Sequence, residues 1–164
     1  MAGRGFYPAR TQDGLPPETK RRVYKSAETW AVGALMVFDS NGELVECGAD
    51  PAAVSGVAAQ ASDTGPGFAM ADSPVVITGR PLETTIYEAN RSTVFSCRGI
   101  NGGTDPVTPT QTMLDTKFGV AADANGIWVL DIADTTNLVC EVVDIDIPNK
   151  IFFVKFLEAV LSLP

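Results

Sequence analysis

Two copies of the string Asp-x-Asn-Gly stand between short apolar runs, and they constrain the fold more than any other feature of the sequence. The first copy, at residues 39–42, joins the apolar runs 34–38 and 43–47, and the second, at residues 123–126, lies in the same setting. Asn-Gly favours a tight hairpin connection because it adopts the positive φ values that such turns demand. The sequence therefore predicts two β-hairpins.

The rest of the chain has a similar spacing of short apolar runs and turn residues, with strands expected roughly every 8 to 12 residues. Further strands are predicted at 54–59, 75–78, 84–87, 93–98, 138–147 and 150–157, and single helical turns at 50–53 and 110–115. The last two strands and the second hairpin are expected to form an antiparallel meander. This pattern, without a long helix, predicts an all-β domain, an antiparallel β-sandwich or a barrel-like fold.

The strand predicted at 150–157 is apolar on both faces. Phe152, Val154 and Phe156 point to one side, and three further apolar residues alternate with them. Such a strand is either central in its own domain or packed against another subunit. The apolar terminal segment 159–163 is the candidate subunit interface, and its interface residues are Val160, Leu161 and Leu163.

The first 28 residues differ from the rest of the chain in charge. They carry a net charge of +3, whereas the whole chain carries −8, so residues 29–164 carry −11. Frequent Gly and Pro argue against helix or sheet before about Arg22, which predicts an extended basic N-terminal arm at 1–28. Residues 29–164 are then a single all-β domain with a loop-rich insertion at 62–116. The candidate partner-binding residues of the arm are Arg4, Phe6, Tyr7, Arg10, Leu15, Lys20, Arg21 and Arg22.

Several functional classes are disfavoured by what the chain lacks. It has no His, which excludes serine–histidine and cysteine–histidine catalysis, and its three Cys have no metal-binding spacing. We find no phosphate-binding glycine motif and no apolar run long enough to span a bilayer. The negative charge argues against a nucleic-acid-binding face. We expect no cofactor, no metal and no membrane contact, and a soluble protein made in a cytoplasm.

Two residue sets leave alternatives open. Asp144 and Asp146, with Asp131 and Asp134 nearby, are a candidate carboxylate pair for catalysis or cation binding, or simply polar residues on the wet face of a strand. The aromatic residues Trp30, Tyr87 and Trp128 are either carbohydrate-stacking residues or core residues.

The sequence also resembles a protein family. Residues 30–46, followed by Gly-Ala-Asp-Pro-Ala-Ala-Val-Ser-Gly-Val-Ala at 48–58, resemble small structural proteins of tailed bacteriophages. Residues 118–131 and 137–156 are similar to the closing strands of the same proteins, which are usually capsid decoration (cement) proteins. The insertion at 62–116 is longer than in the smallest members.

The resemblance implies a β-tulip-like, non-enzymatic virion protein on the outside of an icosahedral head. It implies a homo-oligomer, often a trimer, whose N-terminal arm reaches the major capsid protein, so that the protein stabilises the head by bridging capsid subunits. The alternative is a tail-fibre or carbohydrate-binding β module.

Overall fold

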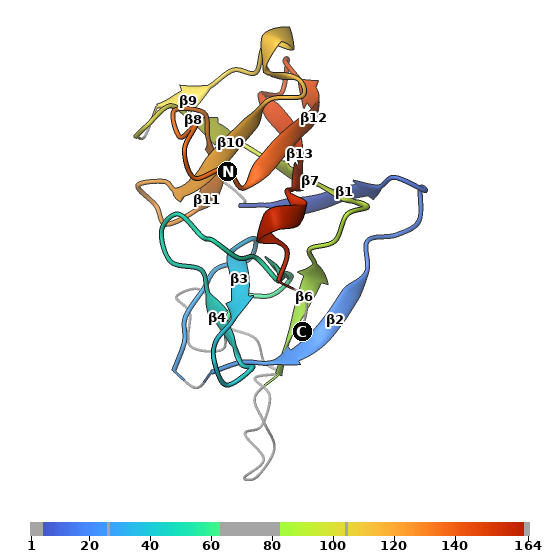
Figure 1. The fold of residues 1–164 in the computed structure, drawn as a ribbon, viewed down its shortest axis with the longest axis vertical. Helices are drawn as coiled ribbons and strands as arrows, with labels where there is room; N and C mark the ends of the chain where they lie inside the picture. The colour runs from blue at the N-terminus through green and yellow to red at the C-terminus, as the bar shows by residue number, and fades with distance from the viewer. Residues whose placement is uncertain (1–4, 26, 63–82, 104, 163–164) are drawn as a thin grey trace.

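The computed structural model describes residues 5–25, 27–62, 83–103 and 105–162, and this part of the chain is built from two β-sheets (Figure 1). The larger sheet contains β1 (Tyr7–Thr11), β7 (Thr93–Cys97), β8 (Gly99–Ile100), β9 (Pro106–Val107), β10 (Lys117–Ala122), β11 (Trp128–Asp131), β12 (Cys140–Asp146) and β13 (Ile151–Phe156). The smaller sheet contains β2 (Thr19–Val23), β3 (Leu35–Phe38), β4 (Leu44–Glu46), β5 (Gly56–Ala58) and β6 (Glu83–Glu88). The predicted all-β class is confirmed.

The larger sheet closes on itself into a barrel-like ring. Its strand order is β1-β7-β13-β12-β10-β11-β8-β9, and only Arg98 separates β7 from β8 along the chain. Since β7 pairs with β13 and β8 pairs with β11, the continuous segment β7–β8 joins both ends of the row. Closure leaves few unpaired strand edges. The two remaining strands, β1 and β9, lie outside the ring, beside β7 and β8 respectively.

The ring leaves no space for a side chain at Gly99. A Cβ atom there would lie 2.6 Å from Cε2 of Phe152, whose ring is fully buried. We therefore predict that Gly99→Ala lowers the free energy of unfolding by about 1–3 kcal/mol, because the packed ring must shift. Urea denaturation measures the change, and Gly103→Ala, which has open space around it, is the matched control and is expected to be near neutral. Equal stability of the two variants would contradict this packing.

The smaller sheet has the order β2-β6-β5-β3-β4, and its ends also approach each other. Tyr24, directly after β2, forms an isolated parallel bridge with Leu44 of β4, and the amide N–H of Lys25 donates to the Leu44 carbonyl at 3.1 Å. The two sheets share one hydrophobic core, because residues of both belong to the same buried cluster.

Both predicted hairpins are confirmed. β3 pairs with β4 and β10 pairs with β11, each antiparallel. In the first turn Oδ1 of Asp39 accepts the amide N–H groups of Asn41 and Glu43, and Asp123 does the same in the second. Only the glycine of each Asn-Gly pair has positive φ, at 77° for Gly42 and 73° for Gly126, so each turn needs one left-handed residue and not two.

Other local predictions have mixed outcomes. The turn at 110–115 is confirmed as the 3₁₀ helix η1 (Gln111–Met113), whereas no helical turn forms at 50–53, where Asp50 has a φ of 51°. The antiparallel pairing of the last two predicted strands is confirmed as β12 with β13. Their predicted connection to the second hairpin is wrong, because β12 pairs with β10 and not with β11. The strand predicted at 75–78 lies outside the described residues.

The strands predicted at 84–87 and 93–98 are confirmed as β6 and β7, so the second part of the segment 62–116 is not a loop-rich insertion. Residues 83–107 form β6 to β9, and β6 and β7 lie between other strands of their sheets. Their alternating Thr, Val, Ile and aromatic residues suit half-buried strands, and the distant partners that hold them are β13 and the N-terminal strands.

The prediction of neither helix nor sheet before Arg22 is also wrong. The N-terminal segment is extended, but it forms β1 along β7 and β2 along β6. Pro8 is tolerated because β1 is an edge strand with a bulge between Pro8 and Arg10. Gly14, Pro16 and Pro17 interrupt only the connecting loop, so they mark a loop between strands and not an unpaired arm.

Candidate functional site

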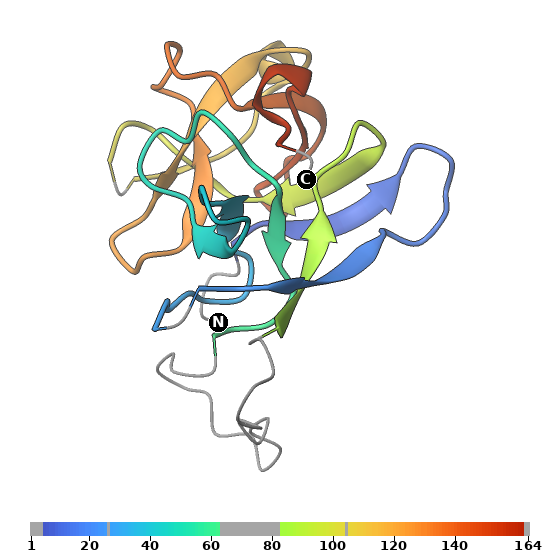
Figure 2. The same ribbon diagram turned by 60° about the horizontal axis from the view of Figure 1, so that its bottom comes forward.

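The N-terminal ribbon, defined as residues 5–25, contains most of the candidate residues. It consists of β1, the loop 12–18 and β2, and each of its strands lies at the edge of a different sheet. Figures 1 and 2 show the two strands diverging from a loop that projects from the body of the protein. One continuous segment therefore presents two sheet edges to the surroundings.

The backbone of β2 has an unpaired outer side. The amide N–H of Glu88 donates to the carbonyl of Glu18 at 3.1 Å, so Glu18 and Glu88 are a hydrogen-bonded pair of the antiparallel ladder. Since such pairs alternate with residues whose backbone groups point away, Thr19, Arg21 and Val23 direct their N–H and C=O groups outward. Within the described residues, no strand pairs with Thr19–Val23 on that side, and β4 meets it only beyond β2, at Lys25. The Arg21 carbonyl accepts a bond from the Arg22 guanidinium at 3.4 Å.

Arg10 is fixed on the outer face of the larger sheet. Its guanidinium lies 2.8 Å from a carboxylate oxygen of Asp144 and 5.4 Å from the ring centroid of Phe153. The hydrogen bond from Arg10 holds the pKa of Asp144 below its usual value. Arg10 therefore binds its own domain, and its net attraction for a partner is reduced.

The cations of β2 differ in how far they are neutralised. Nζ of Lys20 lies 2.5 Å from the largely buried carboxylate of Glu88, and hydrogen bonding to that carboxylate raises the pKa of Lys20. Arg21 lies 3.4 Å from Glu83 but remains highly exposed. Arg22 is half-buried and donates to the Arg21 carbonyl at 3.4 Å, and it has no ion pair within the described residues. Arg21 and Arg22 are therefore the cations of β2 that carboxylates of this chain neutralise least.

The sequence did not identify Glu83, Glu88 and Asp144 as the partners of these cations. In the smaller sheet Glu83 pairs with Val23, and Glu88 pairs with Gly56. In both pairs the two residues are more than thirty positions apart in the sequence. The sequence shows an acidic residue at each end of 83–88. That these residues are partners of Arg21 and Lys20 follows only when the strand pairing is known.

The apolar residues of the ribbon differ in burial. Phe6 is only 1% exposed and stacks on Phe156 with ring centroids 5.6 Å apart, so its predicted role in a partner's pocket is wrong. Tyr7 is 40% exposed and Leu15 is 63% exposed, and both remain accessible. Arg4 lies outside the described residues.

The candidate interface at the C-terminus is largely used within the chain. Val160 ends the 3₁₀ helix η2 (Glu158–Val160) and is buried, and its carbonyl accepts the amide N–H of Val54 at 2.7 Å. The amide of Ser162 in turn donates to the Val54 carbonyl at 3.0 Å. Val160 is therefore a core residue and not an interface residue, Leu161 is half-buried, and Leu163 lies outside the described residues.

Each of the four candidate acidic residues is engaged in contacts within the chain. Asp144 and Asp146 share a face, since they pair with Phe153 and Ile151, but Asp144 binds Arg10 while Asp146 accepts hydrogen bonds from Asn149. Of the remaining two candidates, Asp134 accepts backbone N–H groups of its own turn, and Asp131 accepts the N–H of Ala133 in its own turn and that of Gly102 in a distant one. Turn capping and surface ion pairing account for these carboxylates.

The two tryptophans are core residues, and a carbohydrate-stacking role for them is wrong. Trp30 is 4% exposed and Trp128 is 5% exposed, so neither ring offers a face to a sugar. The indole N–H of Trp30 donates to the carbonyl of Gln60 at 2.9 Å, and that of Trp128 donates to Glu46 at 2.7 Å. Tyr87 is half-buried and packs against Tyr7.

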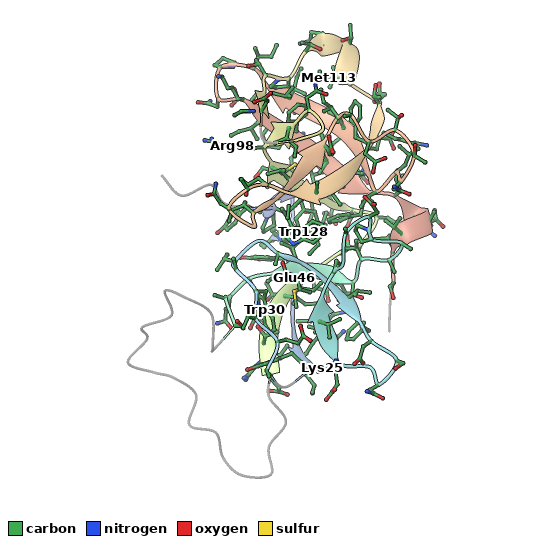
Figure 3. All side chains as sticks on the ribbon, turned by 90° about the vertical axis from the view of Figure 1, so that its left-hand side faces the viewer. Lys25, Trp30, Glu46, Arg98, Met113 and Trp128 are labelled. Carbon is green, nitrogen blue, oxygen red and sulfur yellow. The ribbon has the colours of Figure 1, made fainter. Side chains whose placement is uncertain are left out.

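Glu46 is a carboxylate at the junction of the two sheets. Figure 3 shows Glu46 and Trp128 between the upper and lower parts of the molecule, on β4 and β11. Burial raises the pKa of Glu46, and the bond from the Trp128 indole opposes that shift without cancelling it. The folded protein therefore binds a proton at Glu46 more readily than the unfolded chain does.

This shift predicts how stability depends on pH. The stabilising effect of protonating Glu46 is fully present below its ordinary pKa of 4.5 and is lost as the pH rises through the higher value of the folded protein. Glu46→Gln keeps an acceptor for the indole and removes the charge, so at pH 7 we expect it to be more stable than the wild type by at most about 1 kcal/mol. Denaturation at pH 4 and pH 7 measures this, and a difference between the two proteins that does not change with pH contradicts it.

The three cysteine thiols are not activated as nucleophiles. Cys47, Cys97 and Cys140 are buried free thiols, and burial raises the pKa of the Cys47 thiol to about 12. Burial raises the pKa of the other two thiols as well. At neutral pH all three stay protonated, so they act as small apolar core residues.

Searches of the described residues and comparisons with known proteins add no further site. In that part of the chain, no three His, Cys, Asp or Glu residues gather in a metal-binding arrangement, and no helix has the length and apolar character needed to cross a membrane. No family model, curated protein or solved structure matches the chain. The function has therefore to be inferred from the geometry of the N-terminal ribbon.

Proposed function

We propose that the protein is a non-enzymatic structural protein of a bacteriophage virion. In this proposal it decorates the outer surface of the capsid and stabilises the head by bridging subunits of the major capsid protein through the N-terminal ribbon. The observation that carries the proposal is the outward-facing, basic edge of β2, where unpaired backbone groups lie beside Arg21 and Arg22. The resemblance of residues 30–58 to capsid decoration proteins supports the same assignment.

The chemistry of this edge suits attachment to another protein. The outward N–H and C=O groups of Thr19, Arg21 and Val23 can bind an extended segment of a partner by adding a strand to the sheet, provided that the Arg21 carbonyl exchanges its bond from Arg22 for one from the partner. The neighbouring guanidinium groups favour carboxylates on that segment, because charge-assisted hydrogen bonds are stronger than neutral ones. Many copies on a capsid lattice compensate for a small contact area in each copy.

The edge presented by this protein differs from a free arm in one energetic respect. An arm that becomes ordered on binding loses conformational entropy at that moment, whereas β2 is already ordered along β6. A preformed edge binds with a smaller entropic penalty. The capsid segment that meets it is the element expected to become ordered.

The proposal is tested by adding purified protein to heads of the encoding phage that were assembled without it. We expect the protein to co-sediment with the heads, to saturate at a fixed number of copies and to raise the temperature at which the heads rupture. Absence of co-sedimentation would contradict the proposed function. The mass of the protein in solution and its stoichiometry on the heads test the proposed trimer.

A further inference from the structure

The loop 12–18 at the tip of the N-terminal ribbon is the most prominent apolar projection of the described residues. It leads from β1 to β2 and stands away from both sheets (Figures 1 and 2). Leu15, within it, is 63% exposed, compared with 40–41% for the other exposed large apolar residues, which are Tyr7, Val32 and Ile147. Single exposed apolar residues are common on protein surfaces, so exposure alone does not identify Leu15 as a binding residue. The conformational constraints on its loop are the second observation.

The loop is held by several local constraints. The amide N–H of Gly14 donates to the carbonyl of Thr11 at 3.2 Å, and Gly14 adopts a φ of 74° that glycine tolerates best. The hydroxyl of Thr11 donates to the carbonyl of Leu15. Pro16 and Pro17 then fix their own φ angles near −65°.

Both ends of the loop are also tied to the neighbouring connection. The amide of Gln12 donates to the carbonyl of Ser92 at 2.9 Å, and the amide of Glu88 donates to Glu18 at 3.1 Å. Leu15 therefore projects from a preorganised loop and loses little backbone freedom when it is buried by a partner. Low ordering cost is a property of residues that dominate binding energy at interfaces.

We propose that Leu15 is an anchor that enters an apolar pocket on a partner protein, and that basic side chains line the rim of this pocket. The rim is assigned from charge, because the loop 12–18 contains no cation and Asp13 and Glu18 flank Leu15. Glu18 stays 58% exposed although it lies 3.3 Å from Nζ of Lys20, which it shares with Glu88. The same acidic flanks oppose insertion into an anionic lipid surface. The inference rests on the proposed function in one respect, namely that the partner is the capsid subunit.

The ribbon would then bind through two chemically different parts. The β2 edge offers backbone groups and cations, and the loop offers an apolar side chain between carboxylates. Such an arrangement fixes the orientation of the partner as well as its affinity, because a partner reversed on the ribbon would place its basic rim against Arg21 and Arg22.

The experiment measures the affinity for protein-free heads of the wild type, Leu15→Ala, Leu15→Met and Ile147→Ala. Leu15→Ala is expected to weaken binding by roughly tenfold or more, because truncating an interface anchor removes its buried contacts. Leu15→Met fills a similar volume and is expected to bind nearly as the wild type does. Ile147→Ala, on the turn between β12 and β13, is the control at a similarly apolar exposed position, and no loss is expected.

The outcomes separate the two claims. If the wild type binds and Leu15→Ala binds equally well, the anchor is refuted and the proposed function stands. If Ile147→Ala loses as much affinity as Leu15→Ala, Leu15 is not a specific anchor. If Leu15→Ala changes only the self-association of the free protein, the occupant is a second copy of this chain and the assignment to a capsid subunit is refuted. If the wild type does not bind heads at all, the proposed function fails and the inference fails with it.

Discussion

Replacing Phe6 with alanine is expected to lower the free energy of unfolding by about 3–5 kcal/mol, the usual effect of removing a fully buried aromatic ring. Phe6 is 1% exposed, and Phe156, on which it stacks, also packs edge-on against Phe95 with ring centroids 5.2 Å apart. The amide N–H of Phe6 also donates to the carbonyl of Gly33 at 3.1 Å. Urea denaturation followed by tryptophan fluorescence measures the loss.

Leu15→Ala is the matched control for Phe6→Ala, because both residues belong to the N-terminal ribbon and only Phe6 is buried. We expect Leu15→Ala to change stability by less than about 0.5 kcal/mol. If Phe6→Ala were as stable as this control, the N-terminal segment would be separable from the core. That result would restore the free arm that the sequence predicted.

The burial of Phe6 also determines how attachment can be studied. Deleting residues 1–22 would remove β1, most of β2 and one ring of the core cluster. We expect the truncated chain not to fold, so its failure to bind a capsid would say nothing about the binding surface. Substitutions of exposed residues are the informative test.

Reversing the charge of the two least neutralised cations of β2, with Arg21→Glu and Arg22→Glu together, is expected to reduce binding to heads by about 10- to 100-fold at low salt. Both side chains flank the outward-facing backbone of β2, and the exposed pair between Arg21 and Glu83 contributes little to stability. The difference from the wild type should shrink as salt approaches about 0.5 M, because screening weakens exposed charges. Co-sedimentation with heads over a series of salt concentrations measures both effects.

A control with the same change in charge is Lys117→Glu with Lys155→Glu. These lysines lie on β10 and β13 of the larger sheet, away from β2 in the strand order, on either side of Glu141. If this variant loses as much affinity as the Arg21 and Arg22 variant, net charge and not the β2 edge governs binding. Full binding of the Arg21 and Arg22 variant would rule out the proposed role of that edge.

The sequence predicted what depends on neighbours along the chain. The hairpins at 39–42 and 123–126 are specified by a capping Asp and a left-handed Gly within four residues, and both formed as expected. The 3₁₀ turn at Gln111–Met113 is equally local. The alternation in β13 was also local, but both of its faces are apolar, so only the structure shows that Phe152, Val154 and Phe156 form the buried face.

Pairings between distant segments could not be predicted in the same way. Nothing within residues 5–25 indicates that β1 pairs with β7, more than eighty residues away, or that β2 pairs with β6. The glycines and prolines of this segment were correctly associated with a loop, but the loop is only residues 12–18. The predicted connection of the last two strands to the second hairpin was wrong for the same reason, since nothing local places β12 beside β10 and not β11.

Some residues of the candidate site were predicted and others were not, because residue type alone does not determine which side chains are buried. Residue type identified Arg21 and Leu15, whose exposure follows from charge or from a turn, and also Arg22, which is half-buried. It misassigned Phe6 and Val160, because an apolar residue near a terminus can serve a partner or its own core, and only the packing decides. The acidic partners Glu88 and Asp144 required the register of the sheets.

The most direct test of the account is a density map of the intact phage particle at side-chain resolution. We predict that the map will show this protein on the outside of the head, with the outer edge of β2 and the loop 12–18 against a capsid subunit. Density for the protein in the tail, or on the head with residues 12–23 facing solvent, would contradict it.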